Sequence, residues 1–479
     1  MSRGRSAMAQ SQIAPLAGGV DTADIGTGGV AHWLAAVDGG AVSRADLTDM
    51  ALANALDPEG EGPRTFRSIE REDAGRLARH QDSLAKAGDA TGPLSGLPVS
   101  IKDLFDLEHR TTTAGSVVRR DAETATEDAD AVKRLRAAGA VIVGRTNMTE
   151  FAYSGLGLNP HYGTPRNPFD RNRGLIPGGS SSGAAVSVTD GMAVAAIGSD
   201  TGGSLRIPAA LCGLVGFKPT QARMPMRGVF PLSETLDTIG PIARSVDCCA
   251  RIDAVLSGTR PVALRPRRPR DLRLGVLDRF VTDDLDPAVA AAFESALTKL
   301  SRAGATVRHL AAAPLEDVAG INRRGGFAAV ESYANLGSLL RTAGDKFDRH
   351  VAARILKGRE TSAAAYIGMI KARAAFKYKM TRLDDHADAF VCPTVPVPAP
   401  SIASLEDDDD LHEATHRLMV RNPSIANLLD RPSVSIPCQD AASLPVGFMI
   451  IGRSGEDRAL LEIAAALERV ISPDAAAPQ

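Results

Sequence analysis

The pattern of hydrophobic and polar positions separates a helical beginning of the chain from a region that contains strands. From about Val30 to Leu84, apolar residues recur every three or four positions, which predicts amphipathic helices. Ser43 and Asp46 are residue types that cap such helices. After Pro93 the pattern changes, and residues 98–105 form a short, strongly apolar segment typical of a buried strand. We therefore expect an N-terminal helical segment that leads into a sheet.

Helical and strand patterns then alternate along the chain. A helical pattern over 128–140 precedes an apolar, β-branched strand at 141–147, which predicts a sheet covered on both faces. Residues 272–309 fit one strand–helix–strand unit with Pro287 in the first turn of its helix. A helix cap is expected at Ser245. Two further strands and a closing helix are expected at 388–396, 444–452 and 456–470.

Three segments lack a regular alternation. Residues 1–27 predict a disordered or loosely attached tail. Residues 150–176 are rich in Gly, Pro and Asn, and a long irregular segment in a compact enzyme is typical of a binding loop. Residues 315–385 look helical and more polar, but their individual elements are not predicted.

Composition excludes several classes of function. The 479 residues are 44% hydrophobic, enough for a large core, and the formal net charge of −2 gives no electrostatic argument for a nucleic-acid or membrane partner. No apolar run approaches the roughly 18–20 residues needed to span a bilayer, and we expect no signal peptide. The five cysteines have neither the spacing of a metal site nor that of a paired disulfide framework. This pattern is typical of buried thiols in a reducing cytoplasm.

Two Gly/Ser-rich loops lie within Pro177–Thr220, at 178–183 and 199–204. Glycines mark positions where the backbone turns sharply or approaches another group closely. The second loop offers consecutive backbone N–H groups that suit a developing negative charge, at Thr201, Gly202, Gly203 and Ser204. We expect the two loops to face each other and to hold a serine nucleophile.

The serine would need a base, and Lys102 is a candidate. His161 is the only histidine near the loops in sequence, and no triad assembles around it. Lys102 lies inside the strand predicted at 98–105. It either extends from an edge strand to solvent, or is buried with a depressed pKa so that its neutral amine accepts a proton. The residues alone leave both interpretations open.

A zinc motif offers a competing interpretation. His412 and His416 fit H-E-x-x-H, which on a helix places both imidazoles on one face with Glu413 as general base. No third ligand has a persuasive spacing, and this helix looks exposed. We expect no metal, and keep a non-catalytic or zinc-dependent protein as an alternative. A phosphate-binding P-loop is absent.

The stretch Pro177–Thr220 resembles the signature of the amidase signature family, in which a GGSSGG loop is followed by D-T-G-G-S and R-x-P-A. The resemblance covers most of the chain and is weakest over 315–430. It implies an α/β fold with one large, mixed, twisted sheet covered by helices on both faces. It also implies a single amidase domain over 28–475, with the signature core at about 93–250 and a variable substrate region at about 315–430.

The same resemblance implies roles for individual residues. Ser204 would be the acylated nucleophile, Ser180 a proton-bridging serine after a cis Gly179–Ser180 peptide bond, and Lys102 the buried base. The Gly-rich amides from Thr201 to Ser204 would form the oxyanion hole.

Other residues would support the site. Ser181 and Ser182 are expected to hydrogen-bond the loop rather than react. We predict that Asp200 and Arg206 pair to brace the loop, the alternative being that each faces solvent. Tyr153 and Ser154 align with a segment that walls the acyl pocket, although they suit ordinary packing as well.

The resemblance predicts an amidohydrolase that cleaves a C–N bond of a small carboxamide, anilide or carbamate through an acyl-enzyme, with esterase activity as a side reaction. It implies no cofactor and leaves a homodimer open. The alternative from the same family is the glutamine-hydrolysing A subunit of a tRNA-dependent amidotransferase, which would need separate B and C subunits.

Overall fold

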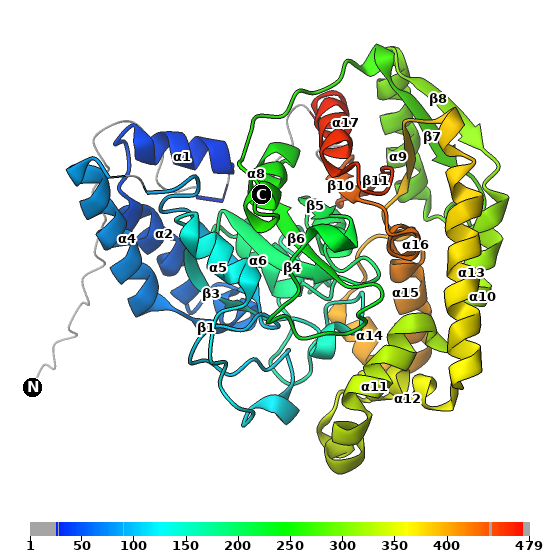
Figure 1. Cartoon of the computed structure of the whole chain (residues 1–479), viewed down its shortest axis with the longest axis horizontal. Helices are drawn as coiled ribbons and strands as arrows, with labels where there is room; N and C mark the ends of the chain where they lie inside the picture. Colours follow the sequence, from blue (N-terminus) through cyan, green and yellow to red (C-terminus); the bar gives the residue numbers. More distant parts are fainter. Residues whose placement is uncertain (1–24, 27, 90, 440–442, 473–479) are drawn as a thin grey trace, which may run out of the picture.

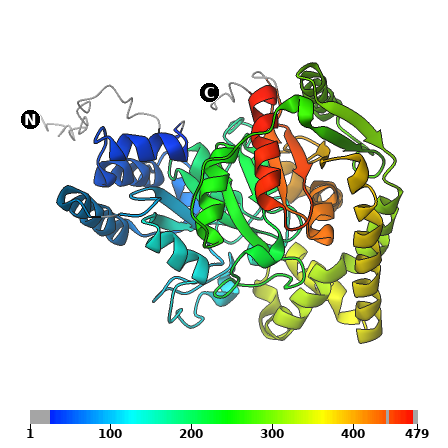
Figure 2. The same cartoon turned by 45° about the horizontal axis from the view of Figure 1, so that its top comes forward.

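One mixed β-sheet runs through the whole molecule (Figures 1 and 2). The computed structural model describes residues 25–26, 28–89, 91–439 and 443–472. Within them, eleven strands lie in the order β1-β3-β2-β4-β6-β5-β10-β11-β9-β7-β8. The strands are β1 (Phe66–Ile69), β2 (Pro98–Lys102), β3 (Val141–Thr146), β4 (Ala195–Asp200), β5 (Val215–Lys218), β6 (Thr238–Ala243), β7 (Arg273–Leu277), β8 (Thr306–Leu310), β9 (Ala389–Pro393), β10 (Ser433–Pro437) and β11 (Gly447–Ile451).

The sheet is mixed because parallel groups flank an antiparallel centre. Strand β2 runs parallel to β3 and β4, and β7 runs parallel to β8 and β9. The strands between them, from β4 through β6, β5, β10 and β11 to β9, pair antiparallel. The single large mixed sheet implied by the signature is confirmed.

Helices cover both faces of the sheet. The α-helices are α1 (Val30–Asp38), α2 (Arg44–Leu56), α3 (Gly62–Thr65), α4 (Arg71–Ala87), α5 (Asp130–Ala137), α6 (Ser182–Thr189), α7 (Arg206–Leu211), α8 (Val246–Leu256), α9 (Pro287–Arg302), α10 (Asp317–Ile321), α11 (Gly326–Ala343), α12 (Arg349–Leu356), α13 (Ala363–Thr381), α14 (Ile402–Asp407), α15 (Asp409–Arg421), α16 (Pro423–Leu429) and α17 (Asp457–Ile471). Successive residues of β6 show the two faces, because Ile242 packs with α6 and α7 whereas Ala243 belongs to the core cluster that includes α8 and α17.

The position of β2 within the sheet shows whether Lys102 is buried or exposed to solvent. Every residue of β2 is buried, and β2 lies between β3 and β4 rather than at an edge. The interpretation in which Lys102 extends to solvent from an edge strand is therefore wrong. A strand with helices on both faces buries side chains of both alternations, including this one.

The N-terminal helices α1, α2 and α4 confirm the helical pattern over 30–84, and they lie together beyond one edge of the sheet (Figure 1). The side chain of Ser43 caps α2 by accepting a hydrogen bond from the amide of Asp46 at 3.0 Å. Strand β1 interrupts this helical region and was not predicted. Its four residues pair with β3, but only Phe66 is fully buried, so the segment is too short to show a strand period.

The tail predicted for residues 1–27 lies almost entirely outside the described residues. Residues 1–24 and 27 lie outside the described residues, but Ile25 is only 2% exposed and belongs to the core. The chain thus joins the core before residue 28.

Several other predictions are confirmed. Strands β7 and β8 with α9 form the strand–helix–strand unit, β9 and β11 are the expected late strands, and α17 is the closing helix. Ser245 caps α8. All five cysteines are buried. No helix among the described residues is long and apolar enough to cross a membrane.

The region 315–385 is helical, as expected, and consists mainly of α10, α11, α12 and α13. In Figure 1 these helices stand with α14, α15 and α16 on the side of the sheet opposite the N-terminal helices. Helix α13 contacts α10, α11 and α16, and α15 contacts α14 and α16. This group of helices forms one wall of the cavity described below.

Candidate active site

The two Gly/Ser-rich loops meet above the ends of β2 and β4. Ser180 and Ser181 lead into α6, and the hydroxyl of Ser181 donates to the carbonyl of Ser199 at 3.4 Å. This contact joins the first loop to the end of β4, from which the second loop leaves. One boundary needs correction, because Ser199 and Asp200 are the last residues of β4 and the second loop begins only at Thr201. The end of β4 consists of small and polar residues, so the sequence alone suggests a loop there.

Lys102 ends β2 directly beneath these loops. Its side chain is 0% exposed, and its Nζ donates to the hydroxyls of Ser180 and Ser199, both at 2.8 Å. Burial lowers the pKa of Lys102 to about 7, against the opposing charges of Asp200 and Asp237. A large fraction of this amine is therefore neutral near pH 7, as a proton acceptor must be.

Ser180 follows a cis peptide bond with Gly179, as the resemblance implies. The amide of Gly179 donates to the carbonyl of Gly155 at 2.9 Å, and the carbonyl of Ser180 accepts from Thr149 at 3.1 Å. A side chain at residue 179 would place its Cβ 2.5 Å from the amide nitrogen of Gly157, so only glycine fits. Ser180 is thus fixed beside Lys102 by its backbone.

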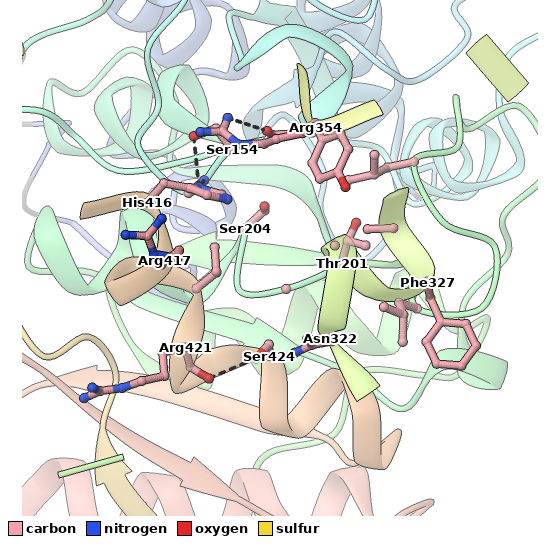
Figure 3. A pocket seen from close by; sticks show the side chains of 18 of the residues that line it. Ser154, Thr201, Ser204, Asn322, Phe327, Arg354, His416, Arg417, Arg421 and Ser424 are labelled. Carbon is pink, nitrogen blue, oxygen red and sulfur yellow. Dashed lines mark hydrogen bonds between the residues drawn. The ribbon is translucent and has the colours of Figure 1, made fainter. Parts of the chain in front are cut away.

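Ser204 opens onto a cavity of about 560 Å³ that Thr201, Gly202, Tyr153 and Ser154 also line (Figure 3). Ser204 is 6% exposed, and its hydroxyl has no hydrogen-bond partner among the described residues. Lys102 and Ser180 are fully buried and do not line the cavity. A hydroxyl without a partner at the edge of a cavity can reach a bound molecule.

The loop between β4 and α7 is held by the Asp200 carboxylate. This carboxylate accepts from the amides of Gly203 at 2.8 Å and Leu205 at 3.1 Å. The expected set of four oxyanion donors is therefore corrected at Gly203, because its single N–H hydrogen already has an acceptor. The amides of Thr201, Gly202 and Ser204 donate to no other described residue.

Asp200 and Arg206 form the predicted pair. Arg206 donates to both carboxylate oxygens, from Nη2 at 2.9 Å and from Nε at 3.1 Å, and both side chains are 0% exposed. The alternative in which each faces solvent is wrong. Burial alone raises the pKa of Asp200, but the charge and hydrogen bonds of Arg206, together with Lys218 and Asn427, hold it at about 2. Arg206 also donates to the carbonyl of Pro423 at 2.8 Å, which ties the loop to α16.

Replacing Asp200 with asparagine is expected to lower the free energy of unfolding by about 3–5 kcal/mol, because the buried guanidinium of Arg206 loses its counter-charge. Urea denaturation of the variant and the parent protein measures this loss. As a control, Asp271→Asn removes the exposed ion pair with Arg268 and should leave the denaturation midpoint nearly unchanged. A loss below about 1 kcal/mol for Asp200→Asn would contradict the bracing role.

Two residues near the loops were not predicted, namely Ser199 and Asp237. Ser199 is the second acceptor of Lys102. Asp237 lies just before β6, where its carboxylate accepts from the hydroxyl of Thr201 and from two backbone amides at 2.9 Å. Burial raises the pKa of Asp237 to about 6. Asp237 lies 36 residues from Thr201 in sequence, so no local pattern indicates their contact.

The H-E-x-x-H helix is α15, and it lines the cavity instead of being exposed as expected. Glu413 forms an ion pair with Arg354 at 2.6 Å, and His412 stacks on His350 with ring centroids 3.6 Å apart. Nδ1 of His416 lies 3.4 Å from both the amide of Gly155 and the hydroxyl of Ser154 (Figure 3).

Burial lowers the pKa of His412 to about 4, and it also lowers the pKa of His416. His416 therefore lies in the cavity wall, and Glu413 is held in an ion pair with Arg354. Within the described residues, no group of three or more His, Cys, Asp or Glu could hold a metal ion.

Comparisons with known proteins show the family of this chain. The family model described as Amidase matches residues 65–461. The chain is 35% identical to the 2-amino-5-chloromuconic acid deaminase of Comamonas testosteroni, over 92% of this chain and 96% of that protein. It is 34% identical to the A subunit of the glutamyl-tRNA(Gln) amidotransferase of a Roseiflexus species, over 90% and 94%.

Among solved structures, a crystal structure of an amidase superposes with a TM-score of 0.84 at 30% identity and covers 93% of this chain and 100% of that one. The family match spans most of the chain, and these relatives align over nearly their whole lengths. The chain therefore belongs to the amidase signature family, whose members hydrolyse carbon–nitrogen bonds.

Proposed function

We propose that this protein hydrolyses the C–N bond of a small amide, with Ser204 as nucleophile, Ser180 as proton relay and Lys102 as base. The observation that carries the proposal is the 2.8 Å hydrogen bond between the buried Lys102 and Ser180, beneath the loop that presents Ser204 to the cavity. A lysine can act as a base only when burial depresses its pKa, as it does here.

The reaction would begin when neutral Lys102 accepts a proton from Ser180 as Ser180 accepts one from Ser204. The Oγ of Ser204 then attacks the amide carbon. The amides of Thr201, Gly202 and Ser204 would donate to the oxyanion as its charge develops. The proton returns through Ser180 to the leaving amine, the C–N bond breaks, and an ester between Ser204 and the acyl group remains. Water hydrolyses that ester by the reverse relay.

A cavity of about 560 Å³ is within the range of sites that enclose small molecules. It is lined partly by apolar side chains, which would hold the body of an amide, anilide or carbamate. The deaminase relative is named for a small organic acid, which supports a small-molecule substrate.

A serine-directed phosphonate tests the proposal. We expect one phosphonyl group per chain, located on Ser204 by peptide mass spectrometry, and protection by a hydrolysed amide. A panel of primary amides, anilides, carbamates and esters then shows which bonds the enzyme cleaves. An unlabelled Ser204 together with no hydrolysis of any amide would overturn the proposal.

A second candidate is the glutamine-hydrolysing A subunit of a tRNA-dependent amidotransferase, which the amidotransferase relatives favour. It requires partner subunits, whereas the proposed hydrolase works alone. Purification from the native host discriminates the two. Obligatory co-purification of B and C subunits with glutaminase activity would favour the amidotransferase, and hydrolysis of other amides by the isolated chain would favour the hydrolase.

A further inference from the structure

Positive charge is concentrated at the cavity that Ser204 lines. The formal net charge of the whole chain is −2. Glu413 is nevertheless the only carboxylate among the side chains that line this cavity, as far as the structure describes the chain. Five basic side chains line it, namely Arg324, Arg354, Lys357, Arg417 and Arg421. The cavity is therefore cationic in a protein that is slightly acidic.

Two of these five basic groups already have partners. Arg354 is 4% exposed at its side chain, forms the ion pair with Glu413, and donates to the carbonyl of Tyr153 at 3.1 Å. Arg421 donates to the carbonyl of Asp283 at 2.6 Å, outside the cavity wall. Both guanidiniums are used to hold the wall in place.

The other three are available to a ligand. Arg324, Lys357 and Arg417 are exposed and have no ion pair or hydrogen bond with any described side chain. Burial would raise the pKa of Glu413, but the charges of Arg354 and Lys357 lower it, so this carboxylate offsets part of the positive charge. One carboxylate among five cations still leaves a repulsion between them, which a bound anion relieves.

Arg417 and Lys357 belong to neighbouring segments of the wall. On α15, Glu413, His416 and Arg417 lie three and four residues apart and so share the helix face that lines the cavity. Lys357 directly follows α12, which carries Arg354. The charges of Lys357 and Arg417 both contribute to lowering the pKa of His416, so both lie near that imidazole.

The cavity is divided into a cationic and an apolar side. Figure 3 shows Ser204 between His416 and Arg417 on one side and Thr201 and Phe327 on the other. Leu232, Leu236 and Val318 add further apolar surface. A molecule that fills both sides has an apolar skeleton and a negative charge.

We propose that the substrate is an amide that carries a carboxylate beyond the scissile bond, and that Arg417 and Lys357 bind this carboxylate. The inference rests on the proposed amidohydrolase function and names its substrate class. Guanidinium and ammonium groups bind carboxylates through charge-assisted hydrogen bonds, which are stronger than neutral ones. Binding the carboxylate on the cationic side would leave the amide carbon beside Ser204.

Glutaramate and pentanamide provide the test, because they differ by a carboxylate in place of a methyl group. We expect kcat/KM, measured by ammonia release, to be at least about tenfold higher for glutaramate. The methyl ester of glutaramate should behave like pentanamide. Raising the ionic strength should lower kcat/KM for glutaramate only. Equal values for the acid and the neutral amides would overturn the inference and leave the amidohydrolase function standing.

Variants locate the carboxylate site. Arg417→Met and Lys357→Met should each reduce the ratio of kcat/KM for glutaramate to that for pentanamide by about tenfold, through KM. Arg341→Met and Lys371→Met are matched controls, since both residues are exposed basic side chains outside the cavity, and they should leave the ratio unchanged. An unchanged ratio in the double variant Arg417→Met/Lys357→Met would contradict the assignment.

Calorimetry with Ser204→Ala separates binding from turnover. We expect this variant to bind glutaramate and to show at least about tenfold weaker binding of pentanamide. If the parent enzyme hydrolyses no amide of the panel and Ser204 is not labelled by the phosphonate, the proposed function fails, while selective binding of glutaramate would still support the anion site. Equal binding of the two amides, or binding of neither, would overturn it.

Discussion

Ser204→Ala is expected to lower kcat for amide hydrolysis by about 10⁴-fold or more, because the variant has no oxygen to form the acyl-enzyme. Ser204 lines the cavity, and in the proposed relay its hydroxyl attacks the bound carbonyl. The remaining activity would come from the oxyanion donors and from binding alone. Single-turnover ammonia release with an amide that the parent enzyme hydrolyses measures the loss, and phosphonate labelling should disappear with it.

Ser424→Ala is the matched control for this prediction. Ser424 lines the same cavity, but its hydroxyl donates to the carbonyl of Arg421 at 2.9 Å and lies outside the relay. Its replacement should cost less than about tenfold in kcat. Ser204→Ala that retains more than about a tenth of the parent activity, with both variants folded by circular dichroism, would exclude Ser204 as the nucleophile.

The parts of the fold that could be predicted are those in which local pattern and final environment agree. Strand β11 is a continuous apolar run, and β3 begins with three β-branched apolar residues, because both strands are buried on both faces. Strand β10 was not predicted, because Ser433 and Ser435 break its apolar pattern although both are fully buried in the sheet. Its place depends on pairing with β11, the next strand along the chain, and with β5, which is distant in sequence.

The site divides in the same way. The nucleophile loop and Ser180 lie within one stretch of sequence and could be identified there. The wall of the cavity could not, because Arg324, Lys357 and Arg417 come from three segments that meet only through packing of the variable helices. The H-E-x-x-H pattern suggests a zinc site, but the helix that carries it instead forms part of the cavity wall. The helix face that carries Glu413 and His416 lines the cavity beside Ser204, and Glu413 forms an ion pair with Arg354.

Lys102→Met should lower kcat by about 10³-fold and remove the acidic limb of the pH–rate profile. In the parent enzyme the base must be neutral, and burial sets the pKa of Lys102 at about 7. Below that pH the amine is protonated, so the rate should fall by about tenfold per pH unit, and above it the rate should reach a plateau. Methionine fills the same volume without an amine, so the loss reports the base rather than a cavity.

The second buried lysine provides the control that decides the assignment. Lys218 ends β5, is 1% exposed, and has a pKa that burial lowers to about 8, but its Nζ donates to the carbonyl of Pro219 at 2.7 Å rather than to a serine of the relay. Lys218→Met should therefore keep the acidic limb near pH 7, whatever its effect on stability. The assignment of Lys102 as base fails if the limb persists in Lys102→Met, or if Lys218→Met is the variant that loses it. Both profiles are measured as kcat on one amide across the pH range in which each variant remains folded, so that only the ionisation of the base distinguishes them.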